Sequence, residues 1–279
     1  MLKSFNTDIK KVIVYGLYMK NLYKRGLSLV LAVFLFLTLV SGCYGSKGKS
    51  EILRDITYWD HIKRGITYCL QGQYNEGIRE FTEAIKINPN NDVAYVERGR
   101  AYFAQWQFNK AIADFNKAIK INPNNAIAYQ SRGYAFYLLG LYEQAIKDYT
   151  KAIKINPNKA SIYTYRASAY AELGQYEKAL TDLAKAIEID PNNPEAYLEL
   201  GKIYDKQGQY YKAIENFTIA IQIDPKCSPA YWWRASTYVN LGLYDKAIRD
   251  ITTAIEIDPT LAEDKGVQYL LDFLRKYQK

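Results

Sequence analysis

Cys69 and His61 are the residues most able to do covalent chemistry. Cys69 could act as a nucleophile, and His61, the only histidine, could act as its base, because a nearby imidazole activates a thiol. Eight residues separate the two on what the apolar spacing predicts to be one helix. At about 1.5 Å of rise per residue they lie more than roughly 10 Å apart. We therefore predict a packed thiol and no catalytic centre.

The spacing of residues also argues against a metal site and against a phosphate-binding loop. His, Cys and carboxylate residues do not cluster as metal ligands do, so we expect no metal and no cofactor. Gly48-Lys49-Ser50 resembles the end of a phosphate-binding loop, but Cys43 stands where that loop has its first glycine. No strand precedes the segment, as such a loop requires. We interpret residues 45–49 as a flexible linker.

A 34-residue period organises most of the chain. Asn-Pro or Asp-Pro dipeptides recur at this interval, at Pro89, Pro123, Pro157, Pro191, Pro225 and Pro259. A fixed period of this length indicates one supersecondary unit stacked repeatedly. Counting back from the prolines gives six units: 58–91, 92–125, 126–159, 160–193, 194–227 and 228–261.

Each unit predicts two short amphipathic helices joined by a tight turn. In the third unit, apolar or small residues recur three and four apart, and Gly140 lies between the two runs, where a turn needs φ > 0. Small residues at unit positions 8 and 27, here Gly133 and Ala152, let the helices approach while aromatic residues fill the remaining volume. Pro157 ends the second helix, because the residue before a proline is pushed out of the α region.

This pattern resembles the tetratricopeptide repeat over residues 58–261. The resemblance implies an all-α fold, an α-solenoid in which about six helix-turn-helix repeats form a right-handed superhelix. Trp106 departs from the pattern by replacing glycine at position 15, and Leu183 and Ile251 replace the aromatic residue at position 24. The apolar spacing of residues 262–279 predicts a capping helix over the last repeat.

Residues 1–42 are interpreted as a leader. An apolar run from Leu27 to Val40 follows Lys24 and Arg25, which is typical of a secretory signal and short for a membrane span of about 20 residues. An uncleaved signal anchor is the alternative. Translation from Met19 instead of the first methionine would give a more compact leader.

The leader ends in a segment, Leu39-Val40-Ser41-Gly42-Cys43, that resembles a bacterial lipobox. The resemblance implies a lipid anchor at Cys43, with residues 43–57 as lipidated N-terminus and linker; two acyl chains suffice for stable membrane attachment. Residues 58–279 would then lie in the cell envelope. In a Gram-negative host, Tyr44 is compatible with the periplasmic face of the outer membrane.

Charge argues against nucleic acid as a partner. The net charge is +8, but residues 1–42 hold six Lys or Arg and one Asp. A nucleic-acid module concentrates more positive charge than the remainder offers. Units 1–3 carry 14 basic and 9 acidic residues, and units 4–6 carry 10 and 14. Either two ancestral repeat types were duplicated, or a basic half faces anionic lipid near the anchor.

In the tetratricopeptide family, the first helices line a concave groove, and unit positions 2, 5, 9, 12 and 13 usually meet the ligand. On this chain the resemblance implies a groove that changes from aromatic and apolar residues to polar ones such as Ser168 and Glu195. The alternative is that individual side chains only pack on the next repeat. The expected partner-binding residues are Trp59, Ile62, Val96, Arg100, Phe103, Ile127, Tyr134, Tyr137, Lys202 and Trp232.

A ladder of arginines at unit position 7 has two interpretations. The arginines could bind an anionic polymer such as a cell-wall strand, or each could reach a neighbouring carboxylate or carbonyl. We favour the second, because long cationic side chains commonly lay their stems over adjacent helices. The ladder comprises Arg64, Arg98, Arg132, Arg166 and Arg234, with Leu200 as the exception.

The combined expectation is a membrane-anchored scaffold or adaptor of the bacterial cell envelope. It would bind a peptide or a partner's helix in the groove, for assembly of envelope complexes. The alternative is a lipoprotein that binds cell-wall glycan or peptidoglycan, or that serves as an adaptor for a hydrolase. The partner, the host and the oligomeric state stay open.

Overall fold

The computed structural model describes residues 46–276, and in this part of the chain every regular element is helical. The helices are α3 (Ser46–Leu70), α4 (Tyr74–Ile87), α5 (Asp92–Ala104), α6 (Phe108–Ile121), α7 (Ala126–Leu138), α8 (Tyr142–Ile155), α9 (Ala160–Glu172), α10 (Tyr176–Ile189), α11 (Pro194–Lys206), α12 (Tyr210–Ile223), α13 (Ser228–Asn240), α14 (Tyr244–Ile257), the 3-10 helix η1 (Pro259–Glu263) and α15 (Lys265–Lys276).

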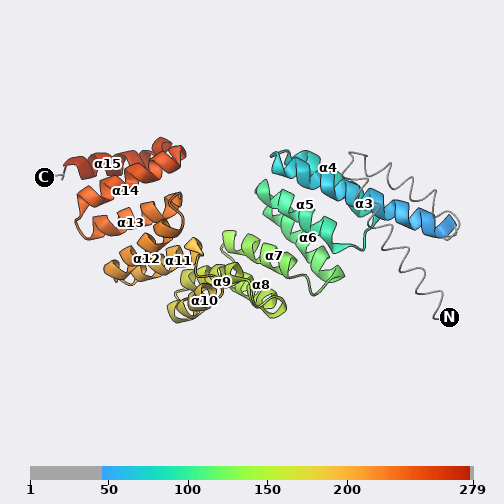
Figure 1. The fold of residues 1–279 in the computed structure, drawn as a ribbon, viewed down its shortest axis with the longest axis horizontal. Coiled ribbons are helices and arrows are strands. Elements are labelled where there is room, and N and C mark those ends of the chain that lie inside the picture. Colours follow the sequence, from blue (N-terminus) through green and yellow to red (C-terminus); the bar gives the residue numbers. More distant parts are fainter. Residues whose placement is uncertain (1–45, 277–279) are drawn as a thin grey trace, which may run out of the picture.

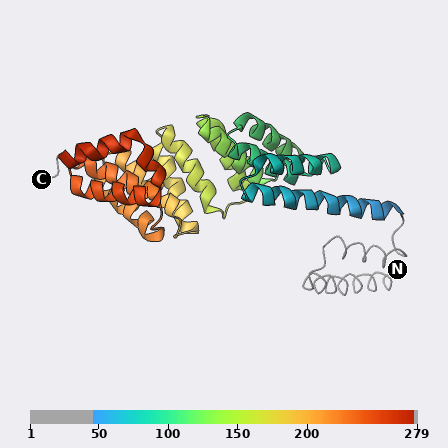
Figure 2. The same ribbon diagram turned by 90° about the horizontal axis from the view of Figure 1, so that it is seen from above.

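The helices form a stack of pairs that bends into an open arc (Figure 1). Each second helix packs on the first helix of its own repeat and on the first helix of the next one. The first helices α5, α7, α9, α11 and α13 also contact one another in succession. They therefore lie on the inner side of the arc, and the view from above shows how the stack extends along its length (Figure 2). The predicted all-α solenoid is confirmed.

Close approach within a repeat depends on a glycine facing an aromatic ring. A Cβ atom built on Gly99 would lie 2.7 Å from the Phe115 ring, and one on Gly201 would clash with the Phe217 ring. Both rings are fully buried. The fourth repeat has Ala167 instead, and its aromatic position holds the smaller Leu183. The two positions thus change together, because a methyl group leaves no room for a ring.

Each turn between paired helices contains one residue with a positive φ, in the left-handed region of backbone conformation. Gly140 has φ of 73°, as predicted, and four other turn glycines have similar values. In the second repeat Trp106 occupies this place with φ of 61° and is 75 % exposed. A side chain in this conformation costs about 1–2 kcal/mol. Trp106 therefore departs from the repeat at a cost in stability.

The prediction of a flexible linker at residues 45–49 is wrong for residues 46–49, which are helical. Helix α3 begins at Ser46 and continues unbroken to Leu70. No proline interrupts residues 46–57, and one isolated glycine costs a helix only about 1 kcal/mol. The first helix of the first repeat is thereby extended towards the N-terminus.

Helix α15 covers the last repeat. Its Val267, Leu271 and Leu274 are buried in one cluster with Ala235 and Ile251 of the sixth repeat. Because these side chains fill a surface that a further repeat would otherwise cover, the helix closes the apolar core at this end.

Candidate partner-binding surface

Stacked aromatic rings cross the inner side of the arc. The Phe103 and Tyr134 rings lie 5.3 Å apart between centroids, with 28° between their planes. The Tyr134 and Tyr165 rings follow at 5.5 Å and 24°. These three residues come from α5, α7 and α9, so the stack spans three successive repeats. Offset stacking of this kind stabilises each ring pair by about 0.5–1.5 kcal/mol.

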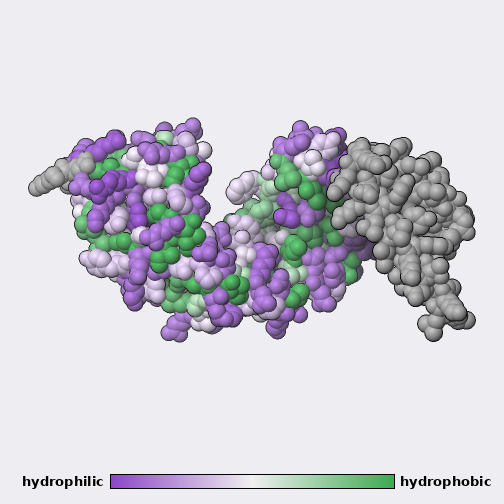
Figure 3. Space-filling model, in the orientation of Figure 1, coloured by the Kyte–Doolittle hydropathy of each residue, from purple (hydrophilic) through white to green (hydrophobic). Residues whose placement is uncertain are grey.

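Two further rings, tilted and edge-on instead of stacked, extend this row into the turn that contains Trp106. Phe108 lies 5.3 Å from Phe103, and Trp106 meets Phe108 edge-on at 5.7 Å. We call Trp106, Phe108, Phe103, Tyr134 and Tyr165 the aromatic row. Trp106 and Tyr134 are exposed, and the inner side of the arc is visibly hollowed, with apolar and polar residues interspersed (Figure 3). Exposed aromatic residues on a hollowed surface are typical anchors for a partner.

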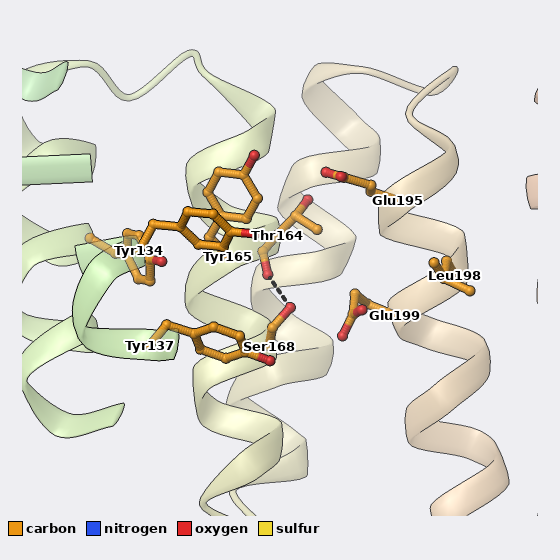
Figure 4. Close-up of a pocket in the computed structure, with 9 residues that line it drawn as sticks. Tyr134, Tyr137, Thr164, Tyr165, Ser168, Glu195, Leu198 and Glu199 are labelled. Carbon is orange, nitrogen blue, oxygen red and sulfur yellow. Dashed lines mark hydrogen bonds between the residues drawn. The ribbon is translucent and has the colours of Figure 1, made fainter. Parts of the chain in front are cut away.

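A pocket of about 160 Å³ opens at the end of the aromatic row, between α7, α9 and α11. Tyrosines of α7 and α9 lie on one side, and residues of α11 face them from the other (Figure 4). The hydroxyl of Ser168 donates to the backbone oxygen of Thr164 at 3.1 Å along the wall between them. The lining residues are Tyr134, Tyr137, Tyr149, Thr164, Tyr165, Ser168, Glu195, Leu198 and Glu199.

The α11 side of the pocket is acidic. Glu199 accepts a hydrogen bond from Lys202 at 2.7 Å, whereas the structure shows no side-chain partner for the Glu195 carboxylate among the residues it describes. Partial burial and the Glu199 charge raise the pKa of Glu195. Burial and the charges of Glu199 and Glu172 raise the pKa of Tyr137. The pocket therefore disfavours further negative charge and favours a cation.

The Tyr149 hydroxyl has no hydrogen-bond partner among the described residues, although it is buried and lines the pocket. Burial and the neighbouring tyrosines raise the pKa of Tyr149 far above its usual range, so the hydroxyl keeps its proton. A buried polar group without a partner costs about 1–3 kcal/mol. A ligand atom that hydrogen-bonds this oxygen would recover part of that cost.

The structure separates the sequence-predicted partner residues into two groups. Phe103, Tyr134 and Tyr137 come together at the aromatic row and the pocket. Ile62 and Val96 are only 3 % exposed, so the expectation that they meet a partner is wrong: their side chains pack in the core. The alternative that some groove positions only pack on neighbouring helices holds for these two.

The remaining predicted residues lie outside the aromatic row. Trp59 and Ile127 are 51 % and 52 % exposed, and Arg100 is exposed beside Glu97. Lys202 is engaged by Glu199 and lies 5.5 Å from the Trp233 ring centroid. Trp232 packs against the cluster that α15 completes. The structure therefore does not unite all ten predicted residues in one site.

The sequence does not predict the contributions of Tyr165, Tyr149 and Glu199 to the pocket. Tyr165 and Glu199 occupy unit position 6, outside the positions carried over from the family, and Tyr149 occupies position 24, where the pattern predicts an aromatic residue of the core. The recurrence of aromatic residues in neighbouring repeats could have indicated Tyr165. The pairing of Glu195 with Glu199, four residues apart on one helix face, could have indicated the acidic wall.

Four of the five ladder arginines are engaged within the fold, and Arg64, which is more exposed, lies 3.0 Å from the Glu80 carboxylate. Arg98 donates from Nε and from its terminal nitrogen to both oxygens of Asp114 at 2.8 Å, and its other terminal nitrogen donates to Thr82 of the preceding repeat at 3.1 Å. The hydrogen bonds to Asp114 raise the pKa of Arg98. The same carboxylate pairing recurs at Arg132 with Asp148, Arg166 with Asp182 and Arg234 with Asp250. These guanidinium groups are occupied and do not form a binding ladder.

In the described part of the chain, His61 has a carboxylate partner and the two cysteines are unpaired. The His61 Nδ1 atom lies 2.8 Å from the Glu80 carboxylate, and burial together with Glu97 raises the pKa of the Cys69 thiol. Both Cys69 and Cys227 are free thiols. In the part of the chain that the structure describes, His, Cys, Asp and Glu do not gather in a group able to hold a metal ion.

Helices of sufficient length and hydropathy to cross a membrane are absent from residues 46–276. The predicted lipid anchor, Cys43, and the leader before it lie outside the described residues.

Comparison with known proteins gives consistent family matches. The profile described as TPR repeat matches residues 65–105, 99–140, 133–174 and 167–208. Two profiles described as tetratricopeptide repeat match residues 194–227 and 228–261. Together the matches extend over well more than half of the chain. A search of curated proteins returned no significant match.

Solved structures share the architecture at low sequence identity. The thermophilic TPR protein TTC0263 of Thermus thermophilus is 23% identical, with a TM-score of 0.56 over 65% of this chain and 99% of that one. The pilF protein of Pseudomonas aeruginosa is 17% identical, with a TM-score of 0.64 over 77% and 98%. The APC/C hetero-tetramer Cut9-Hcn1 is 17% identical, with a TM-score of 0.65 over 87% and 52%. At these identities the likeness shows the fold alone.

Proposed function

This chain belongs to the tetratricopeptide repeat family, whose members bind protein or peptide partners, and from that premise we propose that it is a membrane-anchored scaffold of the cell envelope. It binds an extended peptide or a partner's helix along the inner side of the arc and serves the assembly of an envelope complex. The observation that carries the proposal is the aromatic row, which spans three repeats and is partly exposed.

A binding role explains why the aromatic row is placed where it is. Buried side chains such as Phe115 and Leu183 fill the core between paired helices, whereas Trp106 and Tyr134 of the aromatic row stay exposed. A peptide laid across α5, α7 and α9 would cover the rings and displace water from them. Because rings are rigid and large, they bind at a low cost in side-chain entropy.

A photo-crosslinking amino acid at Tyr134 tests the proposal in intact cells. We expect it to capture one envelope protein, identified by mass spectrometry. The matched control is the same amino acid at Tyr211, an exposed tyrosine on the second helix α12, which should not capture that protein. Equal capture at both positions would count against a specific inner-surface site.

The anchor is tested separately from the groove. We expect the chain to incorporate a labelled fatty acid and to fractionate with membranes, and Cys43→Ala to abolish both. The matched control Cys69→Ser keeps the anchor cysteine while removing another thiol. Labelling that survives Cys43→Ala would remove the lipid anchor from the proposal and leave the peptide-binding surface intact.

Cell-wall binding is the competing assignment. The arginine ladder no longer supports this assignment, because four of its guanidinium groups are paired with aspartates instead of being available to an anionic polymer. The exposed rings of the aromatic row could still stack on sugar rings. Co-sedimentation with purified cell-wall sacculi, compared with pull-down from a membrane extract, separates the two assignments. Retention by sacculi that Tyr134→Ala abolishes would favour the cell wall.

A further inference from the structure

The pocket at the end of the aromatic row has two chemically different walls. Tyr134 and Tyr165 present stacked rings from α7 and α9, and Glu195 and Glu199 present carboxylates from α11 (Figure 4). The carboxylates attract positive charge, and the tyrosine rings offer apolar surface to an aliphatic stem. The combination is the one that binds an ammonium or guanidinium group.

The carboxylates around the pocket outnumber the cations that neutralise them. Lys202 pairs with Glu199 at 2.7 Å, and Lys206 pairs with Glu172 at 3.1 Å. Glu195 has no side-chain partner among the described residues. One carboxylate at the pocket is thus free to accept hydrogen bonds from a ligand.

An independent observation comes from the Tyr149 hydroxyl, which lies at the aromatic side of the pocket. Its side chain is fully buried, and its oxygen has no hydrogen-bond partner within the described part of the chain. As a phenol oxygen it can accept a hydrogen bond from an entering N–H group. Glu195 and Tyr149 therefore offer acceptors from two different helices, α11 and α8.

We propose that this pocket receives a lysine or arginine side chain of the bound peptide, with the aliphatic stem against Tyr134 and Tyr165 and the charged end between Glu195 and the Tyr149 hydroxyl. The proposal rests on the proposed function and adds the chemistry of the partner, which is a basic residue next to a segment that covers the aromatic row. An acidic or phosphorylated residue would meet the Glu195 charge, and an aliphatic residue would leave both acceptors without donors.

Two small probes of the same shape test the charge requirement. n-Butylguanidinium and its neutral counterpart n-butylurea are titrated into the full-length chain, and the methyl signals of Leu198 and Thr164 report binding at the pocket. We expect the cation to bind at least tenfold more tightly. Equal affinity for the two probes would overturn the proposal.

Variants locate the interaction. Glu195→Gln keeps the shape of the side chain and should weaken butylguanidinium binding at least fivefold, and Tyr149→Phe should weaken it twofold or more. The control Glu188→Gln removes a carboxylate from an exposed pair with Lys185 on α10 and should change nothing. A Glu195→Gln protein that is folded but binds the cation like the wild type would also overturn the proposal.

The crosslinking experiment at Tyr134 distinguishes this proposal from the proposed function. If the probe binds as expected and Tyr134 captures no partner, the pocket chemistry stands and the scaffold function fails. If Tyr134 captures a partner equally well in the Glu195→Gln background, the scaffold function stands and the basic-residue pocket fails.

Discussion

Trp106 adopts a backbone conformation that five other turns of this chain give to glycine. Trp106 is 75 % exposed, so burial offsets little of the conformational cost, and its ring meets Phe108 in a T-shaped arrangement. Backbone strain of this kind clusters at functional sites. The exposed indole at the end of the aromatic row is therefore best explained as a contact for the partner.

Replacing Trp106 with glycine should stabilise the protein and weaken partner binding. We expect Trp106→Gly to raise the unfolding free energy by about 1 kcal/mol, since it removes the left-handed strain. The reciprocal control is Gly140→Trp, which has open space around its Cβ and should lose about 1–2 kcal/mol from strain alone. Urea unfolding monitored by circular dichroism measures both. A destabilised Trp106→Gly protein would show that the indole supports the fold.

Within a pair of helices, the residue types at two pairs of contacting positions depend on each other. Gly99 faces the Phe115 ring, whereas Ala167 faces Leu183. The helices of one repeat stay at contact distance in both cases because the volume removed at one position is added at the other. A single change to one member of a pair should therefore cost more than a matched double change.

Gly99→Ala tests this dependence. The new methyl group would lie 2.7 Å from the ring, and the overpacking should cost about 1–3 kcal/mol. Adding Phe115→Leu reproduces the pair found in the fourth repeat and should recover part of the loss. A double-mutant cycle from urea unfolding gives the coupling energy. Strictly additive changes would contradict direct packing between the two positions.

The arginine and aspartate that pair within a repeat form the second set of positions whose residue types depend on each other. In the fifth repeat Leu200 and Asn216 stand at the positions that hold Arg132 and Asp148 in the third. Leu200→Arg alone places a guanidinium group without its carboxylate and should destabilise the protein by about 2 kcal/mol. Leu200→Arg with Asn216→Asp should recover about 1.5–3 kcal/mol through a charge-assisted hydrogen bond. Thermal and urea unfolding of the single and double variants test this coupling.

The repeat period predicts the helices well but not which side chains meet, either within a repeat or between repeats. Gly140 and Pro157 mark helix ends by local backbone chemistry, which a sequence displays directly. Which side chains face the groove depends on the rotation of one repeat against the next. Ile62 was therefore misplaced and Tyr165 was missed. The aspartate that holds each arginine lies 16 residues later on the other helix, so its role appears only when the pair is folded.

Across the whole molecule, charge changes from net positive in the first three repeats to net negative in the last three. No single repeat explains this gradient. Lys86, Lys120 and Lys154 are exposed on second helices of the first three repeats, nearest the predicted anchor. A basic region held near an anionic membrane gains about 1 kcal/mol per lysine close to the surface. Such a gain would orient the arc with its N-terminal repeats against the lipid.

Reversing the three lysines to glutamate should lower binding to vesicles rich in phosphatidylglycerol by at least tenfold, with no effect on neutral phosphatidylcholine vesicles. The matched control reverses Lys178, Lys212 and Lys246, which are exposed on second helices of the C-terminal repeats and carry the same total charge change. Because screening shortens electrostatic attraction, added salt should remove the difference between the two triple variants. If both variants lose lipid binding equally, or neither does, position along the arc has no electrostatic role. Duplication of two ancestral repeat types would then account for the gradient.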